Sequence, residues 1–147
     1  MNSFFECTFR YEKVFEDGLQ KKVNEKYLVD ALSFTEAEAR IIEEMGSCVN
    51  GEFEVKAIKR TKISEIFRNQ TSKYDLRWFT ARLGFILLDE KSGKEKTTRA
   101  TIMVEAENID DAHENIMIGM KGTMADFKIE SITESPILDV FLFESDK

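Results

Sequence analysis

The chain repeats itself, and this repeat constrains its fold more than any other feature. Two segments of equal length, FEVKAIKRTKISEIF at 53–67 and FKIESITESPILDVF at 127–141, both begin and end with Phe. They share Ile at the sixth position (Ile58, Ile132) and at the eleventh (Ile63, Ile137). An internal repeat has to be recognised first, because each copy is one structural unit and the units together form the fold.

The residues before these segments also match, at an offset of 74 or 75. Apolar and polar residues alternate along 5–11 and along 79–85, which predicts a strand with one buried face. A turn follows in each copy, with Asp17-Gly18 in the first and Ser92-Gly93 in the second. A second alternating segment then begins at Tyr27 or Ile102. Each copy therefore starts with a predicted β-hairpin.

A helix is predicted after each hairpin. Ser33 with Glu36, and Asn108 with Asp111, have the spacing of a helix N-terminal cap. The following residues have helical period, and we expect five apolar positions to form the buried face of each helix. These are Phe34, Ala37, Ile41, Ile42 and Met45 in the first copy, and Ile109, Ala112, Ile116, Met117 and Met120 in the second.

The whole pattern predicts an α+β protein built as a tandem duplication of a β-β-α-β unit. Two helices would pack on one face of antiparallel sheet, with a pseudo-two-fold relation between the copies. We expect a single compact domain over 1–147, with the first unit at 1–67, a polar joint at 68–76 and the second unit at 77–142. Whether the two hairpins share one sheet stays open. The groove between the copies is the natural place for a ligand.

The amino-acid composition indicates the class of protein and the compartment in which it is expected. Apolar residues make up 42% of the chain and charged residues 33%, which is typical of a soluble globular protein. The net charge of −7 argues against overall attraction to nucleic acid or anionic membrane, although a local basic patch could still bind either. The two cysteines, Cys7 and Cys48, lack metal-type spacing, and the N-terminus lacks the pattern of a signal peptide. We expect a cytoplasmic protein with no membrane partner.

The sequence offers few groups for catalysis. His113 is the only His, on the side of its helix predicted to be exposed, and one His with two distant cysteines does not make a zinc site. Asp110 and Asp111 could be a metal pair, but acidic residues are expected at a helix N-terminus because of the helix dipole. The common hydrolase and nucleotide-binding motifs are absent from the sequence. We expect no enzyme activity, no cofactor and no metal.

Basic residues cluster in the first copy only. The equivalent stretch of the second copy carries Glu130 and Glu134. Basic residues along a strand could bind a phosphate backbone, and the neighbouring Arg77 and Trp78, with Tyr74 and Phe79, could stack on bases. We call the predicted nucleic-acid site the basic strip: Lys56, Lys59, Arg60, Lys62, Arg68, Arg77 and Trp78. The alternative is a solvated strand edge whose lysines prevent aggregation, with Trp78 in the core.

Four segments, in order, resemble one uncharacterised family: YLVDALSFTEAEARIIEEM, GEFEVKAIKRTKISEIF, WFTARLGFILLDEKSGKEK and MKGTMADFKIESITESPILDVF. This family, a domain of unknown function, occurs in Bacteroidales and in the crAss-like phages that infect them. The resemblance covers nearly the whole chain. It implies a cytoplasmic bacterial or phage setting and brings no catalytic motif.

We therefore expect a non-enzymatic binding protein. The leading candidate ligand is nucleic acid, including single-stranded nucleic acid, held by the basic strip. One alternative is a nucleotide or other small phosphate-bearing ligand in the groove between the copies. Another is a protein-interaction module that binds through a sheet edge. The oligomeric state stays open, and a homodimer is compatible with the sequence.

Overall fold

The structure is a computed structural model that describes residues 3–69 and 75–143 of the 147-residue chain. The described residues form two compact units: unit 1 contains 3–61 and 136–143, and unit 2 contains 62–69 and 75–135. Neither described helix is long and apolar enough to cross a membrane. The elements, in chain order, are β1 (Ser3–Val14), β2 (Gln20–Ala31), α1 (Phe34–Gly46), β3 (Phe53–Arg60), β4 (Ile63–Phe67), β5 (Arg77–Leu88), β6 (Glu95–Ala106), α2 (Ile109–Gly119), β7 (Asp126–Glu134) and β8 (Ile137–Phe141).

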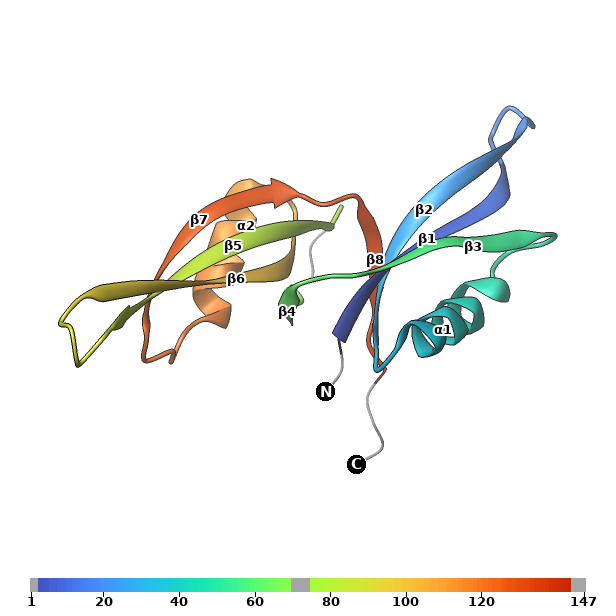
Figure 1. Cartoon of the computed structure of the whole chain (residues 1–147). Coiled ribbons are helices and arrows are strands. Elements are labelled where there is room, and N and C mark those ends of the chain that lie inside the picture. Colours follow the sequence, from blue (N-terminus) through green and yellow to red (C-terminus); the bar gives the residue numbers. More distant parts are fainter. Residues whose placement is uncertain (1–2, 70–74, 144–147) are drawn as a thin grey trace. The chain divides into compact units, whose positions relative to one another are not determined.

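Unit 1 is a four-stranded sheet with one helix on it (Figure 1). Strands β1 and β2 form the predicted hairpin, and Gly18 takes the positive φ of +84° that its turn requires. Strand β3 pairs antiparallel with β1, and β8 pairs parallel with β2, which gives the order β3-β1-β2-β8. Helix α1 packs on one face of the sheet, and its Ala37 and Ile41 form a core with the sheet residues Phe5, Cys7, Phe9, Tyr27, Val29 and Ala31.

Unit 2 has the same topology, with strand order β4-β6-β5-β7 and helix α2 on one face. Its core comes from equivalent positions: Phe79, Ala81, Leu83, Ile102, Val104, Ala106, Ala112, Ile116 and Met120. The α+β class is confirmed, and the two hairpins lie in two separate sheets. Matching topology in the two units is what a duplicated β-β-α-β unit predicts.

The last strand of each sequence copy lies in the sheet of the other copy. Strand β4 follows the first copy's β3 but pairs parallel with β6 in unit 2, whereas β8 follows β7 but pairs parallel with β2 in unit 1. The units therefore change at 61/62 and 135/136, not at the ends of the copies at 67 and 142. We call β4 and β8 the exchanged strands.

Chain geometry explains the exchange. Within its own sheet, β4 would have to cross from the β3 edge to the far side of β2, a distance of about three strand spacings or roughly 14 Å. The link between β3 and β4 is only Thr61 and Lys62, which reaches about 7–11 Å. A link this short cannot cross the sheet, so the strand pairs elsewhere.

The helices bury a narrower face than their sequence pattern predicts. Ala37 and Ile41 are fully buried, and Met45 packs against the core. Phe34 and Ile42 are about half exposed, and so are their counterparts Ile109 and Met117. The prediction that all five positions are buried was therefore wrong at two positions in each helix. A helix lying on a sheet buries one stripe of side chains, and these four residues lie on its flanks.

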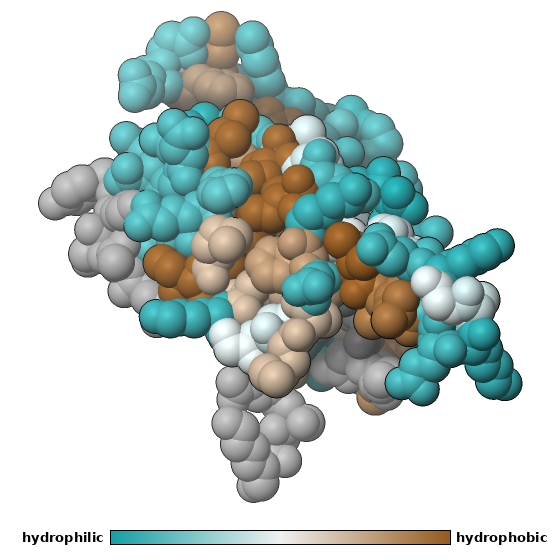
Figure 2. All heavy atoms as spheres, turned by 90° about the vertical axis from the view of Figure 1, so that its left-hand side faces the viewer, coloured by the Kyte–Doolittle hydropathy of each residue, from teal (hydrophilic) through white to brown (hydrophobic). Residues whose placement is uncertain are grey.

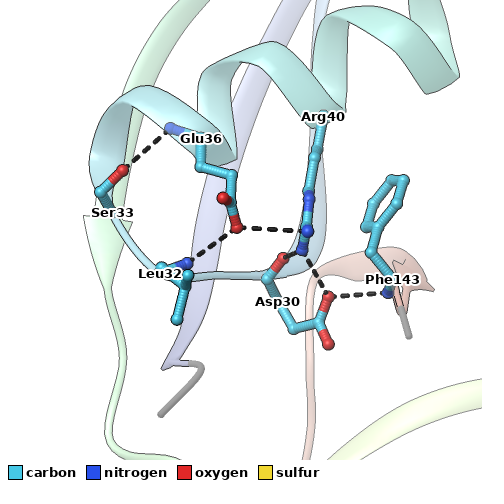
Figure 3. Close-up of polar contacts among 6 residues, drawn as sticks. All are labelled: Asp30, Leu32, Ser33, Glu36, Arg40 and Phe143. Atoms are coloured by element: carbon cyan, nitrogen blue, oxygen red, sulfur yellow. Dashed lines mark hydrogen bonds and ion pairs between the residues drawn. The ribbon is translucent and has the colours of Figure 1, made fainter. Parts of the chain in front are cut away.

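A carboxylate near the end of β2 holds the exchanged strand β8 in place (Figure 3). The Oδ1 atom of Asp30 accepts a hydrogen bond from the backbone N–H of Phe143, just beyond β8, at 2.7 Å. The Arg40 guanidinium donates to the Asp30 carbonyl at 2.6 Å and to Asp30 Oδ1 at 3.2 Å, and lies 4.6 Å from the centre of the Phe143 ring. Ser33 caps the N-terminus of helix α1, because its Oγ accepts a hydrogen bond from the backbone N–H of Glu36.

Unit 2 repeats this arrangement with different side chains. The Oε1 atom of Glu105 accepts from the backbone N–H of Asn69, just beyond β4, at 3.2 Å. Asn115 takes the place of Arg40 and donates to the Glu105 carbonyl at 2.9 Å. Asn108 caps α2 by accepting from the N–H of Asp111 at 2.8 Å, which confirms both predicted caps. We call Asp30 and Glu105 the latch carboxylates.

Gly119 gives the exchanged strand β4 room to dock. A Cβ atom built at Gly119 would lie 2.9 Å from two carbons of the Phe67 ring at the end of β4. We expect Gly119→Val to lower the free energy of unfolding by about 1–3 kcal/mol, as overpacking does. Urea denaturation followed by circular dichroism measures this loss. Glu44→Val, at the equivalent exposed position of α1, is the control, and equal stability of Gly119→Val and wild type would contradict the account.

The two thiols should differ sharply in reactivity. Burial, and then the charge of Glu6, raise the pKa of Cys7 to about 12, while Cys48 is exposed. Reaction with a disulfide reagent at pH 8 should modify Cys48 quickly and Cys7 only after unfolding. Because unfolded Cys ionises near pH 8.5, the protein should also lose stability as the pH rises above about 9. Rapid modification of both thiols in the folded protein would refute this.

Candidate functional site

The basic strip is divided between the two units. Lys56, Lys59 and Arg60 lie on β3 in unit 1, and the other four residues belong to unit 2. Lys59 pairs with Glu6 and Arg60 with Phe5 on β1, so their side chains leave opposite faces of the sheet. The Arg60 guanidinium lies over the rings of Phe5 and Phe34, at 5.2 and 5.7 Å. Lys56, at a bulge in β3, and Lys59 remain exposed.

The unit 2 part of the strip is engaged in internal contacts. Arg77 forms an ion pair with Glu134 at 3.1 Å and donates to the carbonyl of Glu107 at 2.5 Å. The Arg68 guanidinium lies 5.5 Å from the centre of the Trp78 ring. Lys62 is exposed before β4.

The aromatic part of the predicted nucleic-acid site needs correction. Trp78 is only 3% exposed and Phe79 only 1%, so neither ring offers a face on which a base could stack. This burial agrees with the alternative that places Trp78 in the core. Tyr74, the third aromatic residue, lies outside the described residues.

A different site in unit 1 gathers polar side chains around a cavity. The cavity has a volume of about 360 Å³ and lies where β1 continues past the start of β3. Strand β1 supplies Arg10, Tyr11 and Glu12, and β2 supplies Lys22. The turn that leads into β3 supplies Asn50, Gly51 and Glu52, and the start of β3 supplies Phe53 and Glu54. We call this cavity the unit 1 pocket.

Charges of both signs meet at the unit 1 pocket. Arg10 stands opposite Glu54 in the sheet register, and Lys22 stands opposite Glu12. Within the described part of the chain, the side chains of Arg10 and Lys22 make no hydrogen bond and no ion pair. Gly51 has a φ of +107°, a backbone conformation that residues with a side chain rarely adopt. Glycine at this position therefore allows the turn before β3 to line the pocket. Two cations are thus available to a ligand.

A cluster of polar side chains lies next to the unit 1 pocket. The hydroxyl of Tyr27 donates to Glu25 Oε1 at 2.8 Å, and Lys13 Nζ lies 3.8 Å from Glu25 Oε2. Burial, together with the hydrogen bond to Glu25 and its charge, raises the pKa of Tyr27 above its ordinary value. Burial and the same carboxylate raise the pKa of Tyr11, which lines the pocket. Both tyrosines therefore stay neutral hydrogen-bonding groups at physiological pH.

The corresponding region of unit 2 has a similar frame but lacks the polar groups that β1 and β2 supply in unit 1. At the equivalent positions, Arg10 becomes Gly84, Glu12 becomes Ile86 and Lys22 becomes Thr97. The Glu25 position becomes Ala100, and those of Tyr11 and Tyr27 become Phe85 and Ile102. The core positions stay apolar in both units, so the two copies differ here in chemistry and not in fold. Sequence reasoning missed this site, although a position-by-position comparison of the copies holds the signal.

Other chemistry is sparse in the described residues. Over 3–69 and 75–143, no three His, Cys, Asp or Glu side chains gather where they could hold a metal ion. His113 is exposed on α2, as predicted. Asp111 is buried beside the cap of α2 and accepts the N–H of Glu107 at 3.0 Å, which gives this acid a structural role.

The two sheets with exchanged strands define an α+β protein whose two similar units differ in surface chemistry. Residues 3–143 match the model of DUF4494, a domain of unknown function, and the chain belongs to this family. No curated protein and no solved structure matches the chain.

Proposed function

We propose that this protein is a non-enzymatic binding protein that takes a small phosphate-bearing ligand, such as a nucleotide, in the unit 1 pocket. The observation that carries the proposal is the pair of cations, Arg10 and Lys22, on a cavity of about 360 Å³; among the described residues, neither cation has a hydrogen-bond or ion-pair partner. This volume is within the range of small-molecule sites. A phosphate between the two cations would gain charge-assisted hydrogen bonds.

The acidic lining suits the rest of such a ligand. Glu12, Glu52 and Glu54 accept hydrogen bonds, and a nucleoside offers hydroxyl and amino donors. A long polyanion is a poorer fit, because Lys59, Arg10 and Lys22 each have a Glu directly opposite on the neighbouring strand: Glu6, Glu54 and Glu12. A ligand with one phosphate-bearing end avoids most of this repulsion.

A thermal-shift series with nucleoside mono-, di- and triphosphates tests the proposal. Ligand at about 100 times its Kd should add about 2.7 kcal/mol to the stability of the folded state and raise Tm. Arg10→Glu should abolish the rise, whereas Arg82→Glu, an exposed arginine on β5 of unit 2, should leave it intact. No rise with any nucleotide at millimolar concentration would reject the proposal.

Nucleic acid is the second candidate, supported by Lys56 and Lys59. Both are exposed on β3, and within the described residues neither forms a hydrogen bond or ion pair. Anisotropy of a labelled single-stranded oligonucleotide at two salt concentrations would detect binding through phosphates, which weakens with salt. Lys56→Glu with Lys59→Glu is the appropriate variant, because Arg60 also supports the core rings. Binding that this double variant leaves unchanged would exclude the strip.

The setting we propose is the cytoplasm of a bacterium, with the protein encoded by a member of the Bacteroidales or by a crAss-like phage. The resemblance of four ordered segments supports this origin. The two cysteines are unpaired in the structure, as expected of a reducing compartment.

A further inference from the structure

Unit 2 exposes large apolar side chains where unit 1 is mostly polar. They lie on α2 and in the turn before β7: Met117, Ile118 and Met124. We call them the unit 2 apolar face. The equivalent residues of unit 1 are Ile42, Glu43 and Asn50, of which two are polar. Figure 2, which views the left-hand side of Figure 1, shows apolar atoms gathered between hydrophilic ones.

The unit 2 apolar face adjoins a cavity of about 430 Å³ between α2 and β7. Met117, Phe127 and Ile129 give the cavity an apolar lining, and His113, Asp126 and Lys128 bring polar groups to it. Met124 stands two residues before Asp126, and its side chain is 98% exposed. An exposed apolar side chain thus lies close to a cavity of matching chemistry. Methionine is well suited to fill an irregular apolar space.

From this pairing we infer that the unit 2 apolar face binds a second copy of the same chain, with Met124 of each copy entering the cavity of the other. In a two-fold interface the same patch meets itself, so a protruding group and the cavity that receives it must lie on one surface. The charges at the cavity fit the same arrangement. Asp126 and Lys128 have opposite signs, so a second copy can place each against its opposite, whereas a rim of one sign would repel it.

Sedimentation velocity of the full chain over a concentration series tests this inference. We expect a reversible shift from the 17.0 kDa monomer to a species of twice that mass. Met124→Asp and, separately, Met117→Glu should each weaken the dimer at least 100-fold, because each places a charge at the apolar centre of the interface. Asn50→Asp and Ile42→Glu, the equivalent changes in unit 1, are matched controls and should leave the dimer unchanged.

Two results would overturn the inference. One is a monomer at every concentration up to about 1 mM, which would show that the unit 2 apolar face does not bind a second copy of the chain. The other is a dimer that Met124→Asp and Met117→Glu do not affect. Circular dichroism of each variant establishes that it is folded, which is expected because both side chains are exposed. The nucleotide thermal-shift series is independent, because it depends on unit 1 residues.

Discussion

Replacing Trp78 with Ala is expected to lower the free energy of unfolding by about 3–5 kcal/mol, as large aromatic truncations in a core do. Trp78 is 3% exposed, and the Arg68 guanidinium lies over its ring. Urea denaturation followed by circular dichroism measures the loss. Trp78→Phe retains most of the apolar volume and should lose much less.

This experiment separates the two interpretations that the sequence allows for Trp78. If the ring served to stack on a base, Trp78→Ala would leave stability nearly unchanged and would weaken oligonucleotide binding. If the ring is part of the core, stability falls and Trp78→Phe restores most of it. The burial of the side chain predicts the second pattern.

Replacing the latch carboxylate Asp30 with Ala is expected to lower the free energy of unfolding by about 2–3 kcal/mol. The change leaves the Phe143 N–H without its 2.7 Å acceptor and removes the ion-pair partner of Arg40 at 3.2 Å. Asp30→Asn keeps an acceptor oxygen but loses the charge, so it should have a smaller effect. Hydrogen exchange at the amides of β8 should accelerate in Asp30→Ala, because the exchanged strand is released first.

Glu105→Ala is the matched variant in unit 2 and should accelerate exchange at β4 instead. Its partner there is the N–H of Asn69, at 3.2 Å. If either variant accelerates amide hydrogen exchange equally in β4 and β8, the two latch carboxylates do not act on separate strands. Unchanged stability of both variants would contradict the role of the latch carboxylates.

The elements of this fold were largely predictable because local signals fix them. Alternation predicts the hairpin strands, the glycine at φ +84° closes the first turn, and Ser33 and Asn108 cap the helices. The exchange of β4 and β8 was not predicted, because it depends on how far a two-residue link reaches across a folded sheet. The role of Asp30 was hidden for a similar reason, because its partner Phe143 is 113 residues away.

The candidate site was less predictable than the fold. A run of basic residues in the sequence suggested one surface, but strand alternation places Lys59 and Arg60 on opposite faces and the exchange assigns Lys62 to unit 2. The unit 1 pocket combines β1, β2, the turn before β3 and the start of β3, so its residues are dispersed in the sequence. The signal in the sequence is that the second copy lacks several of their polar groups, as Arg10 and Gly84 illustrate.

The most direct test of the account is a two-dimensional ¹H–¹⁵N NMR titration of the full chain with a nucleoside triphosphate. We expect saturable shifts centred on the backbone amides of Tyr11, Lys22 and Gly51, and no such cluster at the equivalent residues Phe85, Thr97 and Ala125 of unit 2. Arg10→Glu should remove the shifts. The absence of shifts at millimolar ligand, or shifts centred on β3 and unit 2, would contradict the assignment of the unit 1 pocket as the binding site.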